Sequence, residues 1–246
     1  MEPSLAGTTH VLFDFFGTLV SYSPSRTEQG YQRSHELLAA AGCAVDYRTF
    51  LERLEGTFED FDRRTLDSLR EFSMDEACEE LLRELLPRGF DAGLVERLRD
   101  AYLTEWSTAV IHLPGVAAML AELAERFTLV LVTNTHHAGL IHEHLQAMDA
   151  ARHFTTVVTS VEHGKRKPSS CIFARALRLA GGTPETSLYV GDSYAADYVG
   201  ATRAGLRCLL IDPERRHDVP ETDRLAHVLD VRTRLLRREE PCASQS

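Results

Sequence analysis

The fold of this chain is decided by residues 11–20, VLFDFFGTLV. An apolar strand ends on the carboxylate of Asp14, and a turn at Gly17 and Thr18 follows. Burying an isolated carboxylate costs on the order of several kcal/mol unless it is paired or binds a metal. In open α/β sheets, ligands bind outside the carboxyl ends of the strands. The stretch therefore favours a functional carboxylate at Asp14 over a simple turn residue.

The chain has 246 residues, of which 43% are hydrophobic, and its formal net charge is −10. This length suffices for one large domain or for a core domain with an insertion. The negative charge argues against binding to nucleic acid or to an anionic membrane surface. An anionic small-molecule substrate would therefore need a local positive site, provided by a metal ion or by a lysine.

The five cysteines are scattered, without the close spacing of a metal site, which is typical of reduced thiols in the cytosol. The N-terminus has no basic segment followed by an apolar core, and Asp14 interrupts its only apolar run. We therefore expect a cytoplasmic protein without a signal peptide or membrane span. The sequence leaves open whether it is a monomer or a homodimer.

Short apolar runs alternate with amphipathic stretches in the second half of the chain. Strands are predicted at 127–132, 155–158, 188–190 and 206–211, and helices at 115–126, 140–148, 169–180 and 195–204. This alternation is typical of right-handed βαβ units. We therefore predict an α/β fold with a Rossmann-like, doubly wound and mainly parallel sheet.

Residues 22–106 contain no strand-like run. Leucines and aromatic residues recur there at helical spacing, in the segments 31–41, 49–61, 74–86 and 94–106. The pattern predicts a helical bundle at 22–106, inserted into an α/β core formed by 1–21 and 107–235. The polar tail, 236–246, is expected to be frayed.

Polar residues follow the predicted strands in four separate segments. They are Asp14; Thr133-Asn134-Thr135; Gly164-Lys165-Arg166-Lys167-Pro168; and the run from Gly191-Asp192-Ser193 to Asp197. In a doubly wound sheet all four segments would converge on one edge. Together they offer a carboxylate nucleophile, a hydroxyl donor, a cation and two further carboxylates.

This arrangement resembles the haloacid dehalogenase superfamily of hydrolases. The matching motifs are DFFGT at 14–18, Thr133-Asn134, Lys167-Pro168, and GDS at 191–193 followed by Asp197. The resemblance covers residues 8–235, and the helical insertion lies where that family carries its cap domain. It implies a hydrolase with an aspartate nucleophile, and it says little about the substrate.

The resemblance assigns the nucleophile and the metal ligands. Asp14 would form a covalent intermediate with the substrate, which divides one difficult step into two. Asp14, Asp192 and the backbone carbonyl of Phe16 would bind Mg²⁺, a hard cation that takes oxygen ligands.

It also assigns the substrate-binding residues. Thr133 would donate to a phosphoryl oxygen, with Gly17 and Asn134 completing the phosphate-binding turn. Lys167 would neutralise charge on the substrate and restrain the nucleophile. Asp197 would hold Lys167 or a metal-bound water.

Phe16 departs from the family pattern. Phosphatases of this family usually carry a second aspartate two residues after the nucleophile, which protonates the leaving group and later activates water. Phenylalanine can do neither, and a positioned general acid–base group contributes about 10²–10⁴-fold. The backbone carbonyl of Phe16 does not depend on the side chain, so metal binding would survive the replacement.

Three functions remain open. The first is a Mg²⁺-dependent phosphohydrolase acting on a small phosphorylated metabolite. The second is a 2-haloacid dehalogenase-type hydrolase, which an aromatic residue at position 16 favours because halide leaves without a proton. The third is a catalytically weakened phosphate-binding protein. Gly191-Asp192-Ser193, which is the phosphatase form of motif four, favours the first.

Other residues are weaker candidates. His136 and His137 follow motif two, and a histidine near the catalytic edge could replace the missing acid. In the helical insertion, Arg26 and Arg33 are candidate contacts for an anionic substrate. The insertion as a whole is expected to act as a lid that excludes water.

Overall fold

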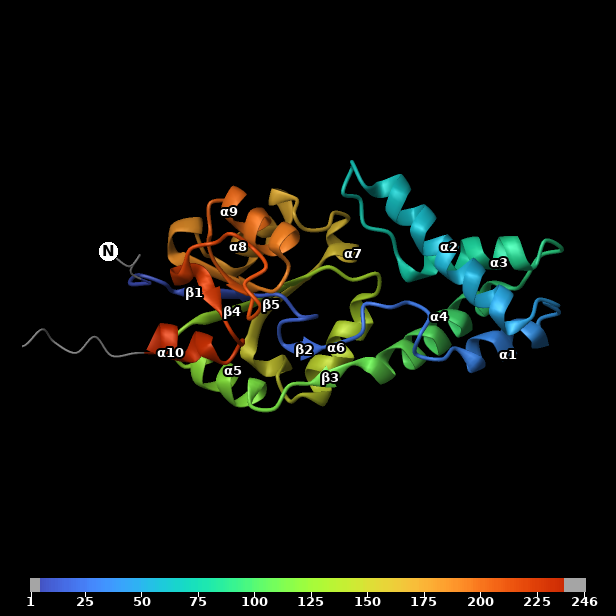
Figure 1. Ribbon diagram of the computed structural model, residues 1–246, viewed down its shortest axis with the longest axis horizontal. Helices are drawn as coiled ribbons and strands as arrows, with labels where there is room; N and C mark the ends of the chain where they lie inside the picture. The colour runs from blue at the N-terminus through green and yellow to red at the C-terminus, as the bar shows by residue number, and fades with distance from the viewer. Residues whose placement is uncertain (1–4, 237–246) are drawn as a thin grey trace, which may run out of the picture.

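The computed structural model describes residues 5–236, whose core is a six-stranded parallel sheet (Figure 1). The strand order is β5-β4-β1-β6-β7-β8, and every pair is parallel. The winding direction reverses between β1 and β6, so the predicted doubly wound α/β fold is confirmed. The strands are β1 (His10–Phe13), β4 (Thr128–Thr133), β5 (Phe154–Thr159), β6 (Ser187–Gly191), β7 (Arg207–Ile211) and β8 (Arg224–Leu225).

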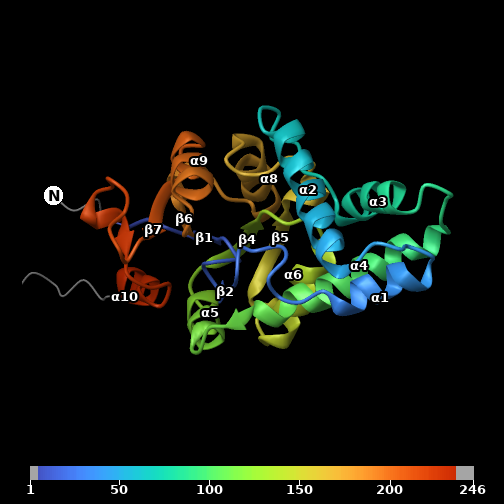
Figure 2. The ribbon, with the colours of Figure 1, turned by 45° about the vertical axis from the view of Figure 1, so that its right-hand side comes forward.

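Helices cover both faces of this sheet (Figure 2). One face is covered by α5 (Val116–Ala124), α6 (Ala138–Ala147) and α10 (Asp230–Leu236), the other by α8 (Ser170–Ala180) and α9 (Gly200–Arg203). Side chains of a strand alternate between faces. Val11 and Phe13 accordingly join the first hydrophobic cluster, and Leu12 joins the second.

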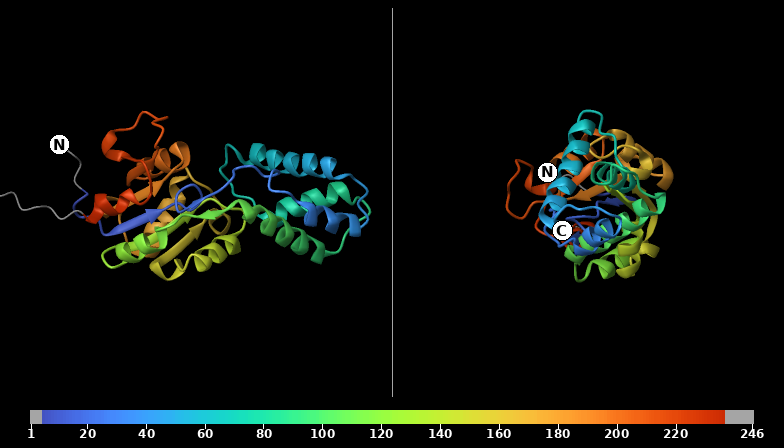
Figure 3. Two further views of the ribbon diagram at one scale, coloured as in Figure 1. Left: turned by 60° about the horizontal axis from the view of Figure 1, so that its bottom comes forward. Right: turned by 90° about the vertical axis from the view of Figure 1, so that its right-hand side faces the viewer.

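A helical insertion connects β2 to β3 and lies beyond the carboxyl-terminal ends of the core strands (Figure 3). Its helices are α1 (Gln32–Ala40), α2 (Tyr47–Thr65), α3 (Met74–Leu85) and α4 (Ala92–Trp106), followed by the 3₁₀ turn η1 (Ser107–Ala109). They share a hydrophobic cluster of their own, centred on aromatic residues such as Phe50, Phe58 and Phe72.

The connection to the core is a short antiparallel ribbon. Its two strands are β2 (Val20–Ser21) and β3 (Ile111–His112), which pair Val20 with His112. Strands of two residues carry too little periodicity to be predicted from sequence.

Local sequence explains where the long helices of the insertion begin. The Asp46 side chain accepts a hydrogen bond from the backbone N–H of Thr49 and caps α2. Ser73 and Glu76 form a reciprocal capping box at the start of α3. Each cap satisfies backbone donors that the first turn of a helix leaves free.

The remaining elements are short. They are η2 (Ala151–His153), α7 (Ser160–His163), η3 (Pro184–Thr186), the π-helical turn η4 (Tyr194–Val199) and η5 (Glu221–Asp223). The helix predicted at 195–204 is therefore divided between η4 and α9. Within the described residues, no helix is long and apolar enough to cross a membrane. The predicted frayed tail lies outside the described residues, apart from Leu236, which ends α10.

Candidate active site

Lys167 lies between two buried carboxylates at the edge of the sheet that faces the insertion. Its Nζ is 2.7 Å from Oδ1 of Asp14 and 2.7 Å from Oδ1 of Asp197. Asp14 directly follows β1, Lys167 precedes α8, and Asp197 lies in the turn after β6. All three residues are buried, and buried charges are tolerated when they are paired in this way.

A third carboxylate, from Asp192, lies at the same place. One oxygen each from Asp14, Asp192 and Asp197 lie within 4.8 Å of one another. Burial and the charge of Asp14 raise the pKa of Asp192 to about 7. Burial, only partly offset by Lys167, raises the pKa of Asp14 to about 6. Three crowded carboxylates thus face one ammonium, a donor set that fits a hard divalent cation such as Mg²⁺.

The neighbouring carboxylates also keep Lys167 protonated. Burial alone would lower the pKa of Lys167, but Asp14 and Asp197 outweigh it and raise the pKa to about 12. The lysine is therefore a permanent cation next to Asp14, which gives a local positive charge in an acidic protein.

Gly17 permits the close approach of Asp192 to the turn after β1. A Cβ at position 17 would lie 2.2 Å from Oδ2 of Asp192, and the φ angle of Gly17 is +81°. Any L side chain would therefore collide with the carboxylate and strain the backbone. Thr18 donates a long hydrogen bond of 3.4 Å to the other oxygen of Asp192.

Tyr189, on β6, braces Lys167 and Asp197. Its hydroxyl accepts from Nζ of Lys167 at 2.9 Å and lies 3.0 Å from both Oδ1 of Asp197 and the carbonyl of Val132. The second oxygen of Asp197 accepts from the backbone N–H of Ser193 at 2.9 Å. These contacts hold Lys167 in one orientation.

The two residues of motif two have different surroundings. The Asn134 side chain accepts from the backbone N–H of Lys167 at 2.8 Å and donates to its carbonyl at 3.2 Å. It thereby holds the loop that carries the lysine. The buried hydroxyl of Thr133 has no hydrogen-bond partner among residues 5–236. Such a group costs about 1–3 kcal/mol if it stays unsatisfied, so it is a donor available to a ligand.

A cavity of about 360 Å³ separates this edge from the helical insertion. A volume of this size suits a small metabolite. Asp14, Thr133, Lys167 and Asp192 line its floor, and the opposite wall comes from the insertion. That wall includes Tyr22, Arg26, Phe58, Glu71, Met74, Tyr102, Leu103 and Trp106.

Phe16 turns its ring towards the insertion. The ring centroid lies 5.3 Å from that of Tyr22 and 5.3 Å from that of Trp106. The side chain therefore forms part of an aromatic wall and offers no proton donor.

The weaker candidates from the sequence lie in different places. His136 and His137 both line the cavity, as does Arg26, which forms an ion pair with Asp62. The cavity lining does not include Arg33.

The sequence-family model of the haloacid dehalogenase-like hydrolases matches residues 8–205 of this chain. This chain belongs to that family. The match spans the motif residues Asp14, Thr133, Lys167, Asp192 and Asp197, which the structure brings to one edge of the sheet. Gly17 and Phe16 lie in the same turn as Asp14.

Named relatives of this hydrolase include phosphatases. A ribulose-1,5-bisphosphate 5-phosphatase of Halopiger xanaduensis is 28% identical over 223 residues, which is 89% of this chain and 91% of the relative. A phosphoserine phosphatase of Thermus thermophilus is 34% identical over 158 residues, covering 63% of this chain and 62% of the relative.

Solved structures share the fold of the hydrolase. A 2-haloacid dehalogenase from Pseudomonas syringae superimposes with a TM-score of 0.72 at 21% identity, over 93% of this chain and 98% of the other. The HAD-hydrolase YfnB from Bacillus subtilis gives a TM-score of 0.59 at 20% identity, over 94% and 99% of the two chains.

Two residues of the hydrolase site, Tyr189 and Glu71, belong to no sequence motif that would have identified them. In the sequence, Tyr189 is indistinguishable from the apolar residues of a buried strand. Only its hydrogen bond with Lys167 shows that it positions the lysine. Glu71 lies in the α2–α3 loop, and its side chain is 1% exposed. A carboxylate in a loop is usually solvated, so the sequence offers no reason to place it at the cavity.

Proposed function

We propose that this hydrolase is a Mg²⁺-dependent phosphohydrolase that acts on a small phosphorylated metabolite, with Asp14 as nucleophile. The observation that carries the proposal is the convergence of three carboxylates, from Asp14, Asp192 and Asp197, within 4.8 Å around one lysine. The relatives named as phosphatases of ribulose bisphosphate and of phosphoserine support this substrate class.

The reaction would have two steps. A carboxylate oxygen of Asp14 attacks phosphorus, and the bond to the leaving oxygen breaks to give an aspartyl phosphate. Water then attacks phosphorus, breaks the bond to Asp14 and releases inorganic phosphate. Lys167 keeps Asp14 in position through their 2.7 Å contact and neutralises charge on the phosphoryl group.

The metal would be held by Asp14, Asp192 and the backbone carbonyl of Phe16. Mg²⁺, when bound, neutralises the phosphoryl oxygens and the excess negative charge of the carboxylates. Thr133 would donate its unpartnered hydroxyl to a phosphoryl oxygen. The turn at Gly17 would let that oxygen approach the backbone closely.

The helical insertion would act as a cap over the reacting atoms. Its residues form one wall of the 360 Å³ cavity, and that wall includes four aromatic side chains, from Tyr22, Phe58, Tyr102 and Trp106. Excluding water strengthens the electrostatic interactions inside the site and prevents side reactions.

A 2-haloacid dehalogenase activity is the second candidate, and Phe16 favours it. Its aromatic ring packs against Tyr22 and Trp106, and a halide needs no proton to leave. The same Asp14 would then attack carbon in place of phosphorus.

One experiment separates the candidates. The purified protein is incubated with a set of phosphomonoesters and 2-haloacids, with Mg²⁺ or with EDTA, and released phosphate and halide are measured. EDTA-sensitive phosphate release supports the phosphohydrolase. EDTA-insensitive halide release supports the dehalogenase, and tight phosphate binding without turnover would make the protein a non-catalytic binder.

A further inference from the structure

We propose that His136 is the general acid and base of this hydrolase, positioned by Glu71, and that this pair replaces the acid that Phe16 cannot provide. The inference rests on the proposed phosphohydrolase function, because only an alcohol leaving group needs a proton. It assigns a catalytic role to a residue of the core and a positioning role to a residue of the insertion.

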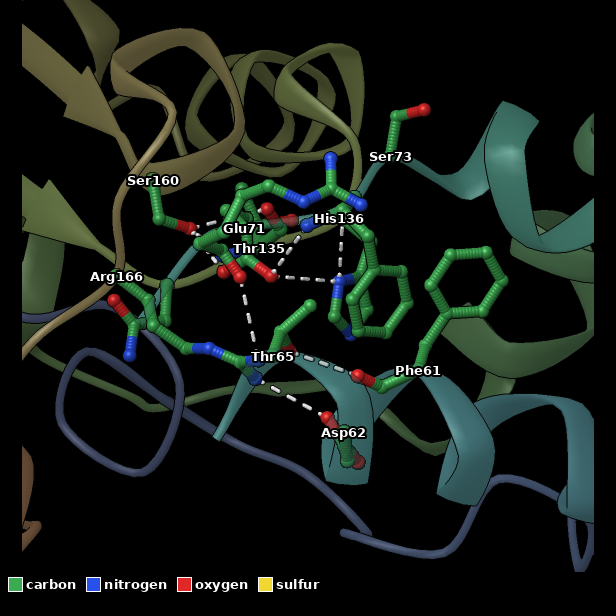
Figure 4. Close-up of polar contacts among 12 residues, drawn as sticks. Phe61, Asp62, Thr65, Glu71, Ser73, Thr135, His136, Ser160 and Arg166 are labelled. Atoms are coloured by element: carbon green, nitrogen blue, oxygen red, sulfur yellow. Dashed lines mark hydrogen bonds and ion pairs between the residues drawn. The ribbon is translucent and has the colours of Figure 1, made fainter. Parts of the chain in front are cut away.

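The two side chains meet across the boundary between core and insertion (Figure 4). Nδ1 of His136 lies 3.2 Å from Oε1 of Glu71 and 3.1 Å from the carbonyl of Phe72. The other oxygen of Glu71 accepts a 2.6 Å hydrogen bond from Ser160. Glu71 belongs to the α2–α3 loop, whereas His136 follows β4.

This geometry defines the tautomer of His136. Nδ1 faces two acceptors, so it carries a hydrogen in either protonation state. The reactive nitrogen is then Nε2, which has no hydrogen-bond partner in the part of the chain that the structure describes. A histidine whose second nitrogen is held by a carboxylate is the usual arrangement of a catalytic acid–base group.

His136 faces the cavity that contains the proposed nucleophile, and its ring is held in place. It lines the same cavity as Asp14 and Thr133. Its ring stacks on Phe72 with a centroid distance of 4.0 Å, and its backbone carbonyl accepts from the N–H of Met74 at 2.8 Å. The side chain keeps 24% of its surface exposed, which leaves it accessible to a ligand.

The charges around the pair favour an ionised Glu71. Burial alone would raise the pKa of Glu71, but His136 and the hydrogen bond from Ser160 outweigh it, and the pKa is lowered. Two arginines lie farther out: Arg166 over the ring of Phe72 at 5.9 Å and Arg26 over the ring of Phe58 at 4.6 Å. Both arginines form ion pairs with Asp62. Glu71 is the carboxylate that contacts Nδ1 of His136.

The proton balance of the reaction is then complete. As Asp14 attacks phosphorus, the P–O bond breaks, the electron pair stays on the leaving oxygen, and Nε2 of His136 gives its proton to that oxygen. Neutral His136 next takes a proton from the water that attacks the aspartyl phosphate. Asp14 is regenerated as a carboxylate, phosphate leaves, and His136 is protonated again.

The test compares leaving groups of different quality in the full-length, Mg²⁺-loaded protein. The substrates are 4-nitrophenyl phosphate, whose phenolate leaves without a proton, and a simple alkyl phosphate, whose alkoxide does not. The ratio kcat/KM includes all steps up to expulsion of the leaving group, so the later hydrolysis does not mask the effect. The variants are His136→Asn, Glu71→Gln and, as matched control, His137→Asn, which changes the neighbouring histidine of the same loop.

We expect His136→Asn to lower kcat/KM for the alkyl ester by about 10²–10⁴-fold and that for the nitrophenyl ester by less than about tenfold. Glu71→Gln should lower kcat/KM for the alkyl ester more than that for the nitrophenyl ester, because the carboxylate fixes the tautomer in which Nε2 transfers the proton. A merely structural role would lower kcat/KM for both esters equally. His136→Gln serves if the asparagine variant does not fold.

Equal losses on both esters, or a leaving-group-dependent loss in His137→Asn instead, would overturn the assignment of His136 while leaving the phosphohydrolase intact. A wild-type protein that releases no phosphate from either ester would overturn the proposed function, and the role of His136 with it.

Discussion

Ser160 of the core donates a 2.6 Å hydrogen bond to Glu71 of the helical insertion. The backbone reinforces this contact, because the N–H of Glu71 donates to the carbonyl of Gly164 at 3.1 Å and that of Arg166 donates to the carbonyl of Leu69 at 2.9 Å. The insertion is thus attached to the core at a second place, distant from the β2–β3 ribbon. The attachment lies on the loop that carries Lys167.

Glu71→Gln is expected to lower the free energy of unfolding by about 1–3 kcal/mol near neutral pH, as loss of a buried charge-assisted hydrogen bond does. The folded pKa of Glu71 lies below its ordinary value of 4.5. A carboxylate of this kind stabilises the fold above that value, and the contribution disappears as the pH falls through the folded pKa. Urea unfolding of both proteins across this pH range measures the difference.

The control for this titration is Glu52→Gln, which changes an exposed carboxylate paired with Arg48 on the insertion surface. Its effect on stability should be small at every pH. A Glu71→Gln deficit of the same size in acid as at neutral pH would contradict the prediction.

Asp14→Asn is expected to abolish turnover while the protein stays folded. Asparagine has the same shape but lacks the negative charge needed to attack phosphorus, so kcat should fall by more than about 10³-fold. Circular dichroism and urea unfolding check the fold, and a phosphate-release assay checks turnover. Activity close to that of the wild type would exclude Asp14 as nucleophile.

Gly17→Ala is expected to remove Mg²⁺ binding, because the new Cβ would lie 2.2 Å from the Asp192 carboxylate and displace it. Calorimetric titration with Mg²⁺ measures the loss. The matched control is Gly30→Ala, since Gly30 has a similar φ of +87° but no atom within 4 Å of the added Cβ. If both variants lose Mg²⁺ affinity equally, backbone strain and not the collision is responsible.

Phe16→Asp is expected to raise kcat/KM for alkyl phosphates, because it supplies the acid that most phosphatases of this family carry. The gain should be modest in the wild-type background and should approach about 10²–10⁴-fold in the His136→Asn background, where the proposed acid has been removed. Phe16→Asn is the control, since it removes the same ring without adding an acid. An absence of gain in both backgrounds, with Mg²⁺ still bound, would refute this explanation of Phe16.

The sequence was sufficient to predict the parallel sheet and the meeting of Asp14, Lys167, Asp192 and Asp197. Hydrophobic runs define the strands, and the carboxyl ends of parallel strands share an edge, so Asp14 and Asp192, which directly follow β1 and β6, converge there, as do the loops that carry Lys167 and Asp197. The prediction was less accurate at 195–204, where the structure has a π-helical turn before α9. Apolar periodicity does not distinguish these two kinds of helix.

What the sequence determined by itself was therefore the class of fold, the identity of the strand-end carboxylates and the absence of a proton donor at Phe16. Only the tertiary structure decided that Glu71 meets His136 and Ser160, and that Tyr189 braces Lys167. The reason is physical: the positions of strands and helices follow from local patterns that each segment carries alone, whereas these contacts join segments far apart in the chain. They exist only once the insertion has packed against the core.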